Sequence, residues 1–174
     1  LTDTERSMIA IYNGVAQGVQ PLISRAYGQH LREQTLQLLH CAMASLIALS
    51  AVIYLVLFLF AGPIAQIFNS ENNALLHAIA VPGLRLYFIA APFAGLNIVL
   101  CSYFAASERA LPSQILSLLR GLILLIPAAF GFSALWGITG VWLSFPAAEF
   151  FTAAAGAACL FLFGKKAARQ NEEI

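Results

Sequence analysis

Long apolar stretches alternate with short polar connections along this chain. Windows of about 20 residues, set against a hydrocarbon core about 30 Å thick, predict five membrane-spanning segments. None of them alternates with a two-residue period over about ten residues, which favours helices over barrel strands. The sequence therefore predicts an all-α, polytopic membrane helix bundle. The predicted spans are Met8–Ala26, Leu36–Ala61, Leu86–Ala106, Ile115–Leu135 and Val141–Phe163.

The first span carries a polar stripe. Its polar positions fall at helical offsets of four, three and three, so they share one face of a 3.6-residue period. Polar groups at bilayer depth usually face a protein interior or a cavity, which predicts contact with water or substrate. The stripe consists of Asn13, Gln17, Gln20 (or Pro21, one position on) and Ser24.

The third span repeats this pattern more weakly. Tyr87 and Asn97 share a face with small residues and Cys101, which makes both candidates for the lining of a substrate cavity. The alternative for Asn97 is a hydrogen bond across a helix interface, worth about 0.6 kcal/mol in membrane proteins.

The composition indicates a membrane environment, and the distribution of basic residues indicates a topology. Of 174 residues, 60% are hydrophobic and 10% charged, with a mean hydropathy of +0.82, against about 25% charged in soluble domains. The lipid bilayer is thus the first partner, and a net charge of +1 does not point to nucleic acid. If the spans alternate, most basic residues lie on one side, which the positive-inside rule makes cytoplasmic. That side holds Arg25, Arg32, Arg109, Lys165, Lys166 and Arg169, and the other holds Arg6 and Arg85.

This topology places the N-terminus outside and residues 165–174 inside, as a cytoplasmic tail. The expected membrane is the plasma membrane, here the bacterial inner membrane. Residues 1–164 form the membrane part. In the external connection between Gly62 and Arg85 we expect a short interfacial helix, capped by Ser70 with Glu71 in its first turn. This helix is expected to lead into the third span through Pro82–Gly83.

Four of the five spans contain a proline. Each proline removes a backbone donor and is expected to bend its helix, as in the bent helices that surround transporter cavities. The alternative is that prolines are simply more frequent in membrane helices. The expected bend sites are Pro21, Pro92, Pro127 and Pro146.

Glu149 and Arg120 are the ionisable groups predicted at membrane depth. A carboxylate there costs several kcal/mol unless it is paired or hydrated. One interpretation is a structural ion pair between the two, although an axial offset of roughly 9 Å would require water or helix tilt. The others are a proton- or cation-responsive carboxylate, or a side chain facing lipid.

Chemical motifs are absent. The sequence contains no H-E-x-x-H, P-loop or G-x-S-x-G pattern, so we expect no enzyme, and no cofactor or metal site is predicted. The three cysteines lack metal-ligand spacing and are interpreted as small packing residues.

Several short motifs, taken in order, resemble the C-terminal half of MATE (multidrug and toxic compound extrusion) transporters. The resemblance covers nearly the whole chain. It rests on GVAQGVQPLIS at Gly14–Ser24 with Tyr27–Gly28, GPIAQIF at Gly62–Phe68, YFAASERA at Tyr103–Ala110, Leu119–Arg120 before Ile126–Pro127, and GITGVW at Gly137–Trp142 before Pro146.

The resemblance implies that the five spans correspond to helices eight to twelve of a twelve-helix exporter. Such exporters exchange small organic, often cationic, substrates for Na⁺ or H⁺ by rocking two halves around a central cavity. The chain would then be a fragment that lacks the N-terminal half, and inactive alone. One branch places coupling carboxylates on the first and fourth helices of this half. The first is missing here and Leu86–Ala106 has no acid, so the resemblance carries over no such site, and Glu149 lies on a different helix.

Two alternatives stay open. One is a flippase for lipid-linked saccharides in the same superfamily, whose cavities are typically rich in arginine and lysine. The other is a small stand-alone membrane scaffold protein with five helices.

The fragment interpretation predicts that the genomic reading frame continues upstream of Leu1. We expect roughly 250 to 300 further codons with six or seven spans, at about 20 apolar residues per span plus loops. A stop codon directly before Leu1 would contradict it, and a start codon there would favour the scaffold protein.

Overall fold

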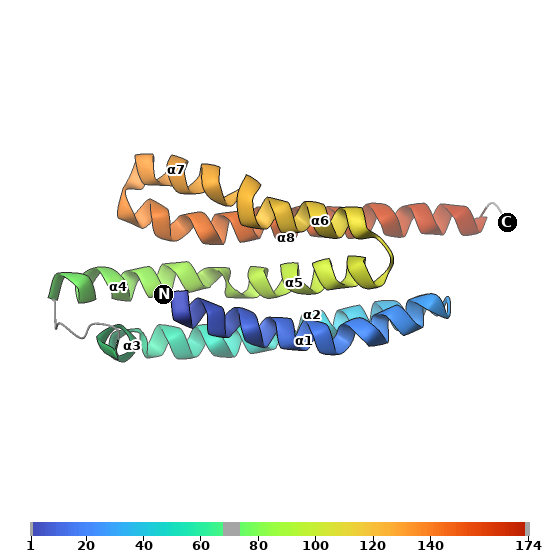
Figure 1. The fold of residues 1–174 in the computed structure, drawn as a ribbon, viewed down its shortest axis with the longest axis horizontal. Helices are drawn as coiled ribbons and strands as arrows, with labels where there is room; N and C mark the ends of the chain where they lie inside the picture. The colour runs from blue at the N-terminus through green and yellow to red at the C-terminus, as the bar shows by residue number, and fades with distance from the viewer. Residues whose placement is uncertain (1, 68–73, 173–174) are drawn as a thin grey trace.

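Five long helical segments run antiparallel in turn along an elongated bundle (Figure 1). The structure, a computed structural model, describes the backbone of residues 2–67 and 74–172 and the side chains of 4–67, 74 and 77–163. The predicted all-α membrane bundle is confirmed. In order, the elements are α1 (Thr2–Gly28), α2 (Arg32–Leu59), α3 (Ala61–Ile67), α4 (Ala74–Tyr87), the 3₁₀ turn η1 (Phe88–Ala90), α5 (Ala91–Ala106), α6 (Ala110–Leu118), the π-helical turn η2 (Leu119–Ile123), α7 (Leu125–Trp136) and α8 (Ile138–Glu172).

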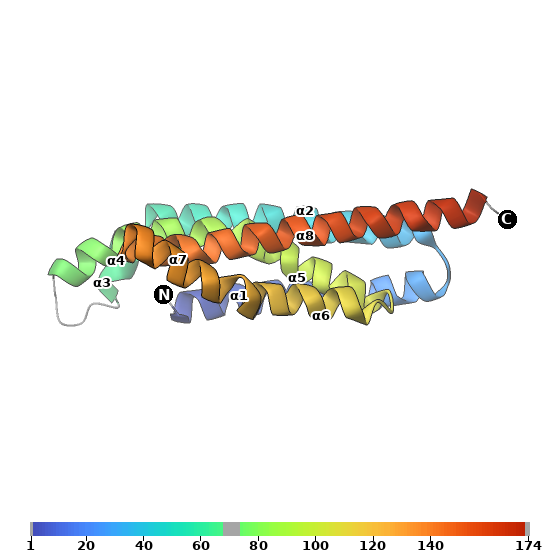
Figure 2. The ribbon, with the colours of Figure 1, turned by 90° about the horizontal axis from the view of Figure 1, so that it is seen from above.

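The helix α5 lies at the centre of the bundle, and α6 and α7 lie at its edge (Figures 1 and 2). α5 contacts α1, α2, α6 and α8. In the span that contains α5, His77–Ala106, 61% of the most apolar window is buried, against 6% in Ala110–Trp136. The apolar side chains of α6 and α7 are therefore left for lipid to cover.

Small residues bring α1, α2 and α5 together at the centre. Ala91 and Ala94 are fully buried, and a Cβ atom added to Gly95 would lie 3.2 Å from Ser50 Oγ and 3.6 Å from Tyr12 Cε2. Ser50 Oγ itself donates to Leu46 O at 2.6 Å and to Ala91 O at 3.3 Å, so its hydroxyl is satisfied within the interface. Close backbone approach at small residues is the usual way in which membrane helices pack.

Four helical segments of the described chain are long and apolar enough to cross a membrane, and α1 is not among them. Its polar stripe lowers its hydropathy. With 27 residues, however, α1 spans about 40 Å at 1.5 Å per residue and lies alongside α2 and α5. Its length and position thus match a fifth span with one polar face.

The external connection differs from the sequence-based prediction. α4 is not a separate interfacial helix, because it continues through Pro82 and Gly83 and joins α5 through η1. Gly83 is buried against α8, where a Cβ atom would lie 2.7 Å from Trp142 Cε2. This contact holds α4 within the bundle. The predicted cap at Ser70 and Glu71 lies outside the described residues.

Helix type changes before two of the four prolines. The 3₁₀ turn η1 begins at Phe88, four residues before Pro92, and the π turn η2 ends at Ile123, four residues before Pro127. Because proline lacks an N–H, the carbonyl four residues earlier loses its usual donor, and a local change of helix type accommodates this. α1 and α8 continue as α-helices through Pro21 and Pro146.

A tight turn joins α7 to α8. Gly137 adopts φ 57° and ψ −134°, a conformation that is essentially restricted to glycine. Three residues later, Gly140 packs directly on the α7 backbone, where a Cβ atom would overlap the carbonyl of Phe132. The hairpin therefore depends on the missing side chain at Gly140.

We predict that Gly140→Ala destabilises the bundle by about 1–3 kcal/mol, because the added methyl group forces α7 and α8 apart. The matched control is Gly131→Ala on α7, where the structure leaves open space around the added Cβ atom. Thermal unfolding in detergent should show a lower Tm for the first variant only. Equal Tm values would contradict this account of the hairpin.

Candidate functional site

Asn97, Arg120 and Glu149 form a polar centre that joins three segments of the bundle. Arg120 Nε donates to Glu149 Oε1 at 2.7 Å. Asn97 Nδ2 donates to Glu149 Oε2 at 2.7 Å and to the Glu149 carbonyl oxygen at 2.9 Å. Asn97 and Glu149 are fully buried, whereas the Arg120 side chain is 20% exposed.

Arg120 reaches Glu149 directly, without the predicted offset of roughly 9 Å. The guanidinium of Arg109 lies 4.4 Å from the centre of the Phe163 ring, which aligns these two residues along the bundle. Arg120 follows Arg109 by eleven residues, and Glu149 precedes Phe163 by fourteen residues. This leaves an axial difference of about 4.5 Å, which a long arginine side chain can cover.

Arg120 lies within the π turn η2. Within η2 the amide of Leu124 donates to the carbonyl of Leu119 at 2.9 Å, a five-residue step. The wider turn inserts one residue into the helix and so changes the face on which the following side chains lie. Such turns are frequent at functional positions, and the sequence signal for this one was Pro127, four residues after its end.

Asn97 borders no open surface in this structure. Its alternative interpretation, a hydrogen bond across a helix interface, describes the contact with Glu149. A role for Asn97 in a substrate cavity stays a prediction. Its Oδ1 atom is buried and has no hydrogen-bond partner among the described residues.

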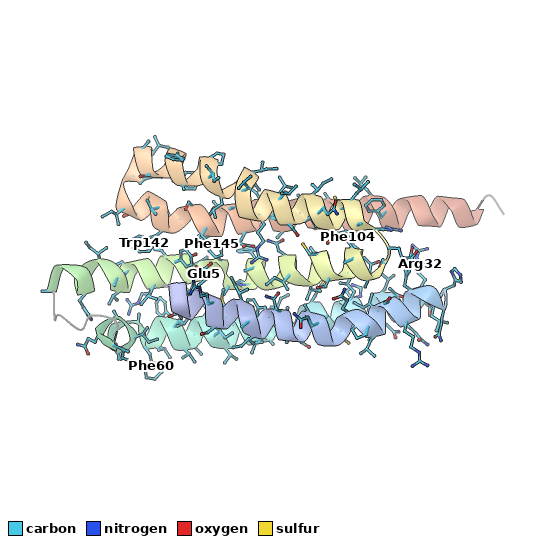
Figure 3. All side chains as sticks on the ribbon, in the orientation of Figure 1. Glu5, Arg32, Phe60, Phe104, Trp142 and Phe145 are labelled. Carbon is cyan, nitrogen blue, oxygen red and sulfur yellow. The ribbon has the colours of Figure 1, made fainter. Side chains whose placement is uncertain are left out.

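Tyr87 connects α4 with α1 and α8. Its hydroxyl donates to Glu5 Oε2 at 2.8 Å, and its ring stacks on Phe145 with centroids 4.5 Å apart. Figure 3 labels Glu5, near the start of α1, and Phe145 of α8, the two residues that Tyr87 contacts. Glu5 was not among the predicted site residues, because the predicted span began only at Met8.

The polar stripe of α1 lies beside its packed face, about a third of a turn away around the helix. Tyr12, Ala16 and Ile23 are buried toward the other helices. The stripe residues Asn13, Gln17 and Ser24 are exposed, and Gln20 is half-buried. This face of α1 is thus polar, uncharged from Asn13 to Ser24, and turned away from the rest of the chain.

No metal centre is evident in the described part of the chain, which holds no group of three or more His, Cys, Asp or Glu side chains placed to bind an ion. The thiol of Cys41 is exposed, while Cys101 and Cys159 are partly buried. Of the predicted site residues, the structure thus joins Asn97, Arg120 and Glu149, and leaves the α1 stripe as a separate surface.

The MatE family model matches residues 2–130, about three-quarters of the chain. The chain belongs to the MatE family. Like the proteins that it resembles, it is therefore assigned to a family of membrane transporters.

Known relatives of this MatE-family chain are considerably longer. It is 23% identical over 165 residues to a FAD transporter of Shewanella oneidensis, covering 92% of the chain and 34% of that protein. It superposes on an outward-facing multidrug resistance MATE transporter of the MOP superfamily with a TM-score of 0.85 and 19% identity. A Vibrio cholerae MATE transporter in its bent form gives 0.82 and 20%. The chain spans 38% of each of these solved chains, and 98% and 97% of it are covered.

We predict that Arg120→Gln alone destabilises the protein by about 3–5 kcal/mol, since it leaves the buried Glu149 carboxylate without its cation. The double variant Arg120→Gln/Glu149→Gln should recover most of this loss, because two amides can hydrogen-bond without a buried charge. Tm and the yield of membrane-inserted protein measure both effects.

The control for this pair is Arg25→Gln, which removes an exposed arginine of α1. If the double variant is no more stable than Arg120→Gln, the ion pair does not hold these helices together, and a different role for Glu149 is favoured.

Proposed function

We propose that this chain forms the larger part of one lobe of a secondary active exporter, which moves organic molecules against Na⁺ or H⁺ by alternating access. The observation that carries the proposal is the exposed, uncharged polar stripe on α1. Transfer of amide side chains into hydrocarbon is unfavourable in free energy, so we expect this face to contact water, substrate or protein. The chain is proposed to act as a transporter segment and not as an enzyme.

The arrangement of the bundle supports this assignment of faces. α6 and α7 present apolar side chains at one edge, whereas α1 packs on α2 and α5 at the other edge (Figure 1). A lobe with one lipid face and one polar face suits a cavity shared with a second lobe. The coverage of about two fifths of the solved transporters leaves room for that second lobe.

The polar centre supports a rigid lobe. Its contacts connect α5, η2 and α8, so these segments would move as one body when the lobe rocks. Glu149 is paired with Arg120, and we therefore assign ion coupling to residues outside this chain. One branch of MATE transporters places a coupling carboxylate on the helix that residues 86–106 resemble. Residues 86–106 of this chain contain no acid.

The substrate class is proposed from the chemistry of the stripe. Neutral amides and a hydroxyl bind organic molecules through hydrogen bonds and do not select the sign of a charge. A small organic, often cationic, drug fits such a surface. A flavin nucleotide is a second candidate, which the similarity to the FAD transporter supports.

A saccharide flippase receives less support. Recognition of a pyrophosphate needs free cations, and Arg120 is the one basic residue deep in a predicted span. Its Nε already donates to Glu149.

We propose further that the end of the bundle with Arg25, Arg32 and Arg109 faces the cytoplasm of a bacterial inner membrane, because basic residues gather there.

We predict that Gln17→Ala, made in the complete reading frame that contains this chain, lowers resistance to at least one drug, or flavin export, by about two- to tenfold, since it removes one hydrogen bond of about 0.5–1.5 kcal/mol. Export from an efflux-deficient strain measures the effect for both substrate classes.

Gln114→Ala is the matched control, because Gln114 is also exposed but lies on α6, away from the stripe. Membrane levels of both variants should equal that of the wild type. Unchanged export of every tested substrate by Gln17→Ala and Asn13→Ala would remove the stripe from the transport route.

A further inference from the structure

We propose that a groove between α6 and α8 binds one anionic phospholipid from the surrounding leaflet. The groove has a volume of about 560 Å³ and lies beside the α5–α6 turn. Residues 108–112 and Ile115 line one side, and Cys159 and Phe163 of α8 line the other. This volume is within the range of about 300–1,000 Å³ that is typical of ligand sites.

The position of the groove fits the boundary between hydrocarbon and headgroups. Arg109 directly precedes Ala110, the first residue of one membrane span. Phe163 ends an apolar stretch of α8 and is followed in the sequence by Gly164, Lys165 and Lys166. Leu111 and Ile115 are more than half exposed, at 71% and 54%, whereas Leu116 of the same helix is buried. An acyl chain lying in the groove would cover these side chains.

The cation at the end of the groove fits a lipid phosphate. The guanidinium of Arg109 lies over the Phe163 ring, 4.4 Å from its centre, and this cation–π contact fixes its position. Stacking on a ring face leaves the edge of a guanidinium, with its N–H donors, available to phosphate oxygens. No carboxylate forms an ion pair with Arg109 among the residues that the structure describes.

The surrounding charge favours an anionic over a zwitterionic headgroup. Glu108 is the one acid that lines the groove, and its side chain is exposed. The basic residues are more numerous. They are Arg109 and, shortly after Phe163 in the sequence, Lys165, Lys166 and Arg169. Clusters of basic residues next to a membrane span attract anionic lipids by about 1 kcal/mol per residue.

The test is lipid binding by the purified chain in detergent, followed by native mass spectrometry while phosphatidylglycerol or phosphatidylethanolamine is added. We expect the wild type to retain phosphatidylglycerol preferentially. Arg109→Gln should weaken this retention about fivefold, the factor that corresponds to roughly 1 kcal/mol per basic residue at a lipid surface. Arg109→Lys should lose less, because it keeps the charge.

Glu108→Gln separates the two headgroup classes. For an anionic lipid, removing this carboxylate relieves repulsion and should strengthen retention. For a zwitterionic lipid, the carboxylate would attract the ammonium group, and the same variant would weaken retention. Arg25→Gln and Glu33→Gln are matched controls, since both change exposed charges near the other turn at this end of the bundle and do not line the groove.

Cys159 supplies a second measurement inside the groove. In a Cys41→Ser/Cys101→Ser background it is the one remaining thiol of the chain. Phosphatidylglycerol should slow its reaction with a maleimide, and Ile115→Trp, which is designed to fill the groove, should slow the reaction without lipid. Circular dichroism checks that each variant is folded.

Three outcomes would overturn the proposal. They are equal or better retention of phosphatidylethanolamine by the wild type, unchanged phosphatidylglycerol retention in a folded Arg109→Gln protein, and dimers that disappear with Ile115→Trp, which would show a second copy of the chain in the groove. The proposal does not depend on transport activity.

Discussion

The buried carboxylate of Glu149 is the constraint around which the centre of this bundle is organised. A charge at such a position is tolerated only with a cation and hydrogen bonds beside it. Arg120 supplies the cation and Asn97 the amide, and each comes from a different segment. The requirement to satisfy one side chain therefore fixes the relative positions of α5, η2 and α8.

Helix irregularity makes this arrangement possible. The π turn η2 carries Arg120, and the 3₁₀ turn η1 precedes α5, which carries Asn97. Each turn ends or begins four residues before a proline, where a regular helix would lack a hydrogen bond. The prolines thus influence the polar centre indirectly, through the turns that accommodate them.

The bundle presents three different surfaces as a result. α6, α7 and the exposed side of α2 offer apolar side chains to lipid, α1 offers a neutral polar face, and the groove at Arg109 places a cation beside apolar side chains. This division of surfaces suits the proposed transporter lobe, in which one face would contact lipid and another would contact water and substrate. The contacts of the polar centre would hold the lipid face and the polar face together as one rigid body.

The sequence by itself determined the fold class and the polar stripe of α1, because hydropathy and a 3.6-residue period are local properties of the chain. The family resemblance was also evident from the order of short motifs. Only the tertiary structure decided that Asn97 faces α8, that α4 joins α5, and that Tyr87 meets Glu5. These contacts depend on helix tilt, close approach at small residues and the register set by irregular turns, none of which a periodic pattern encodes.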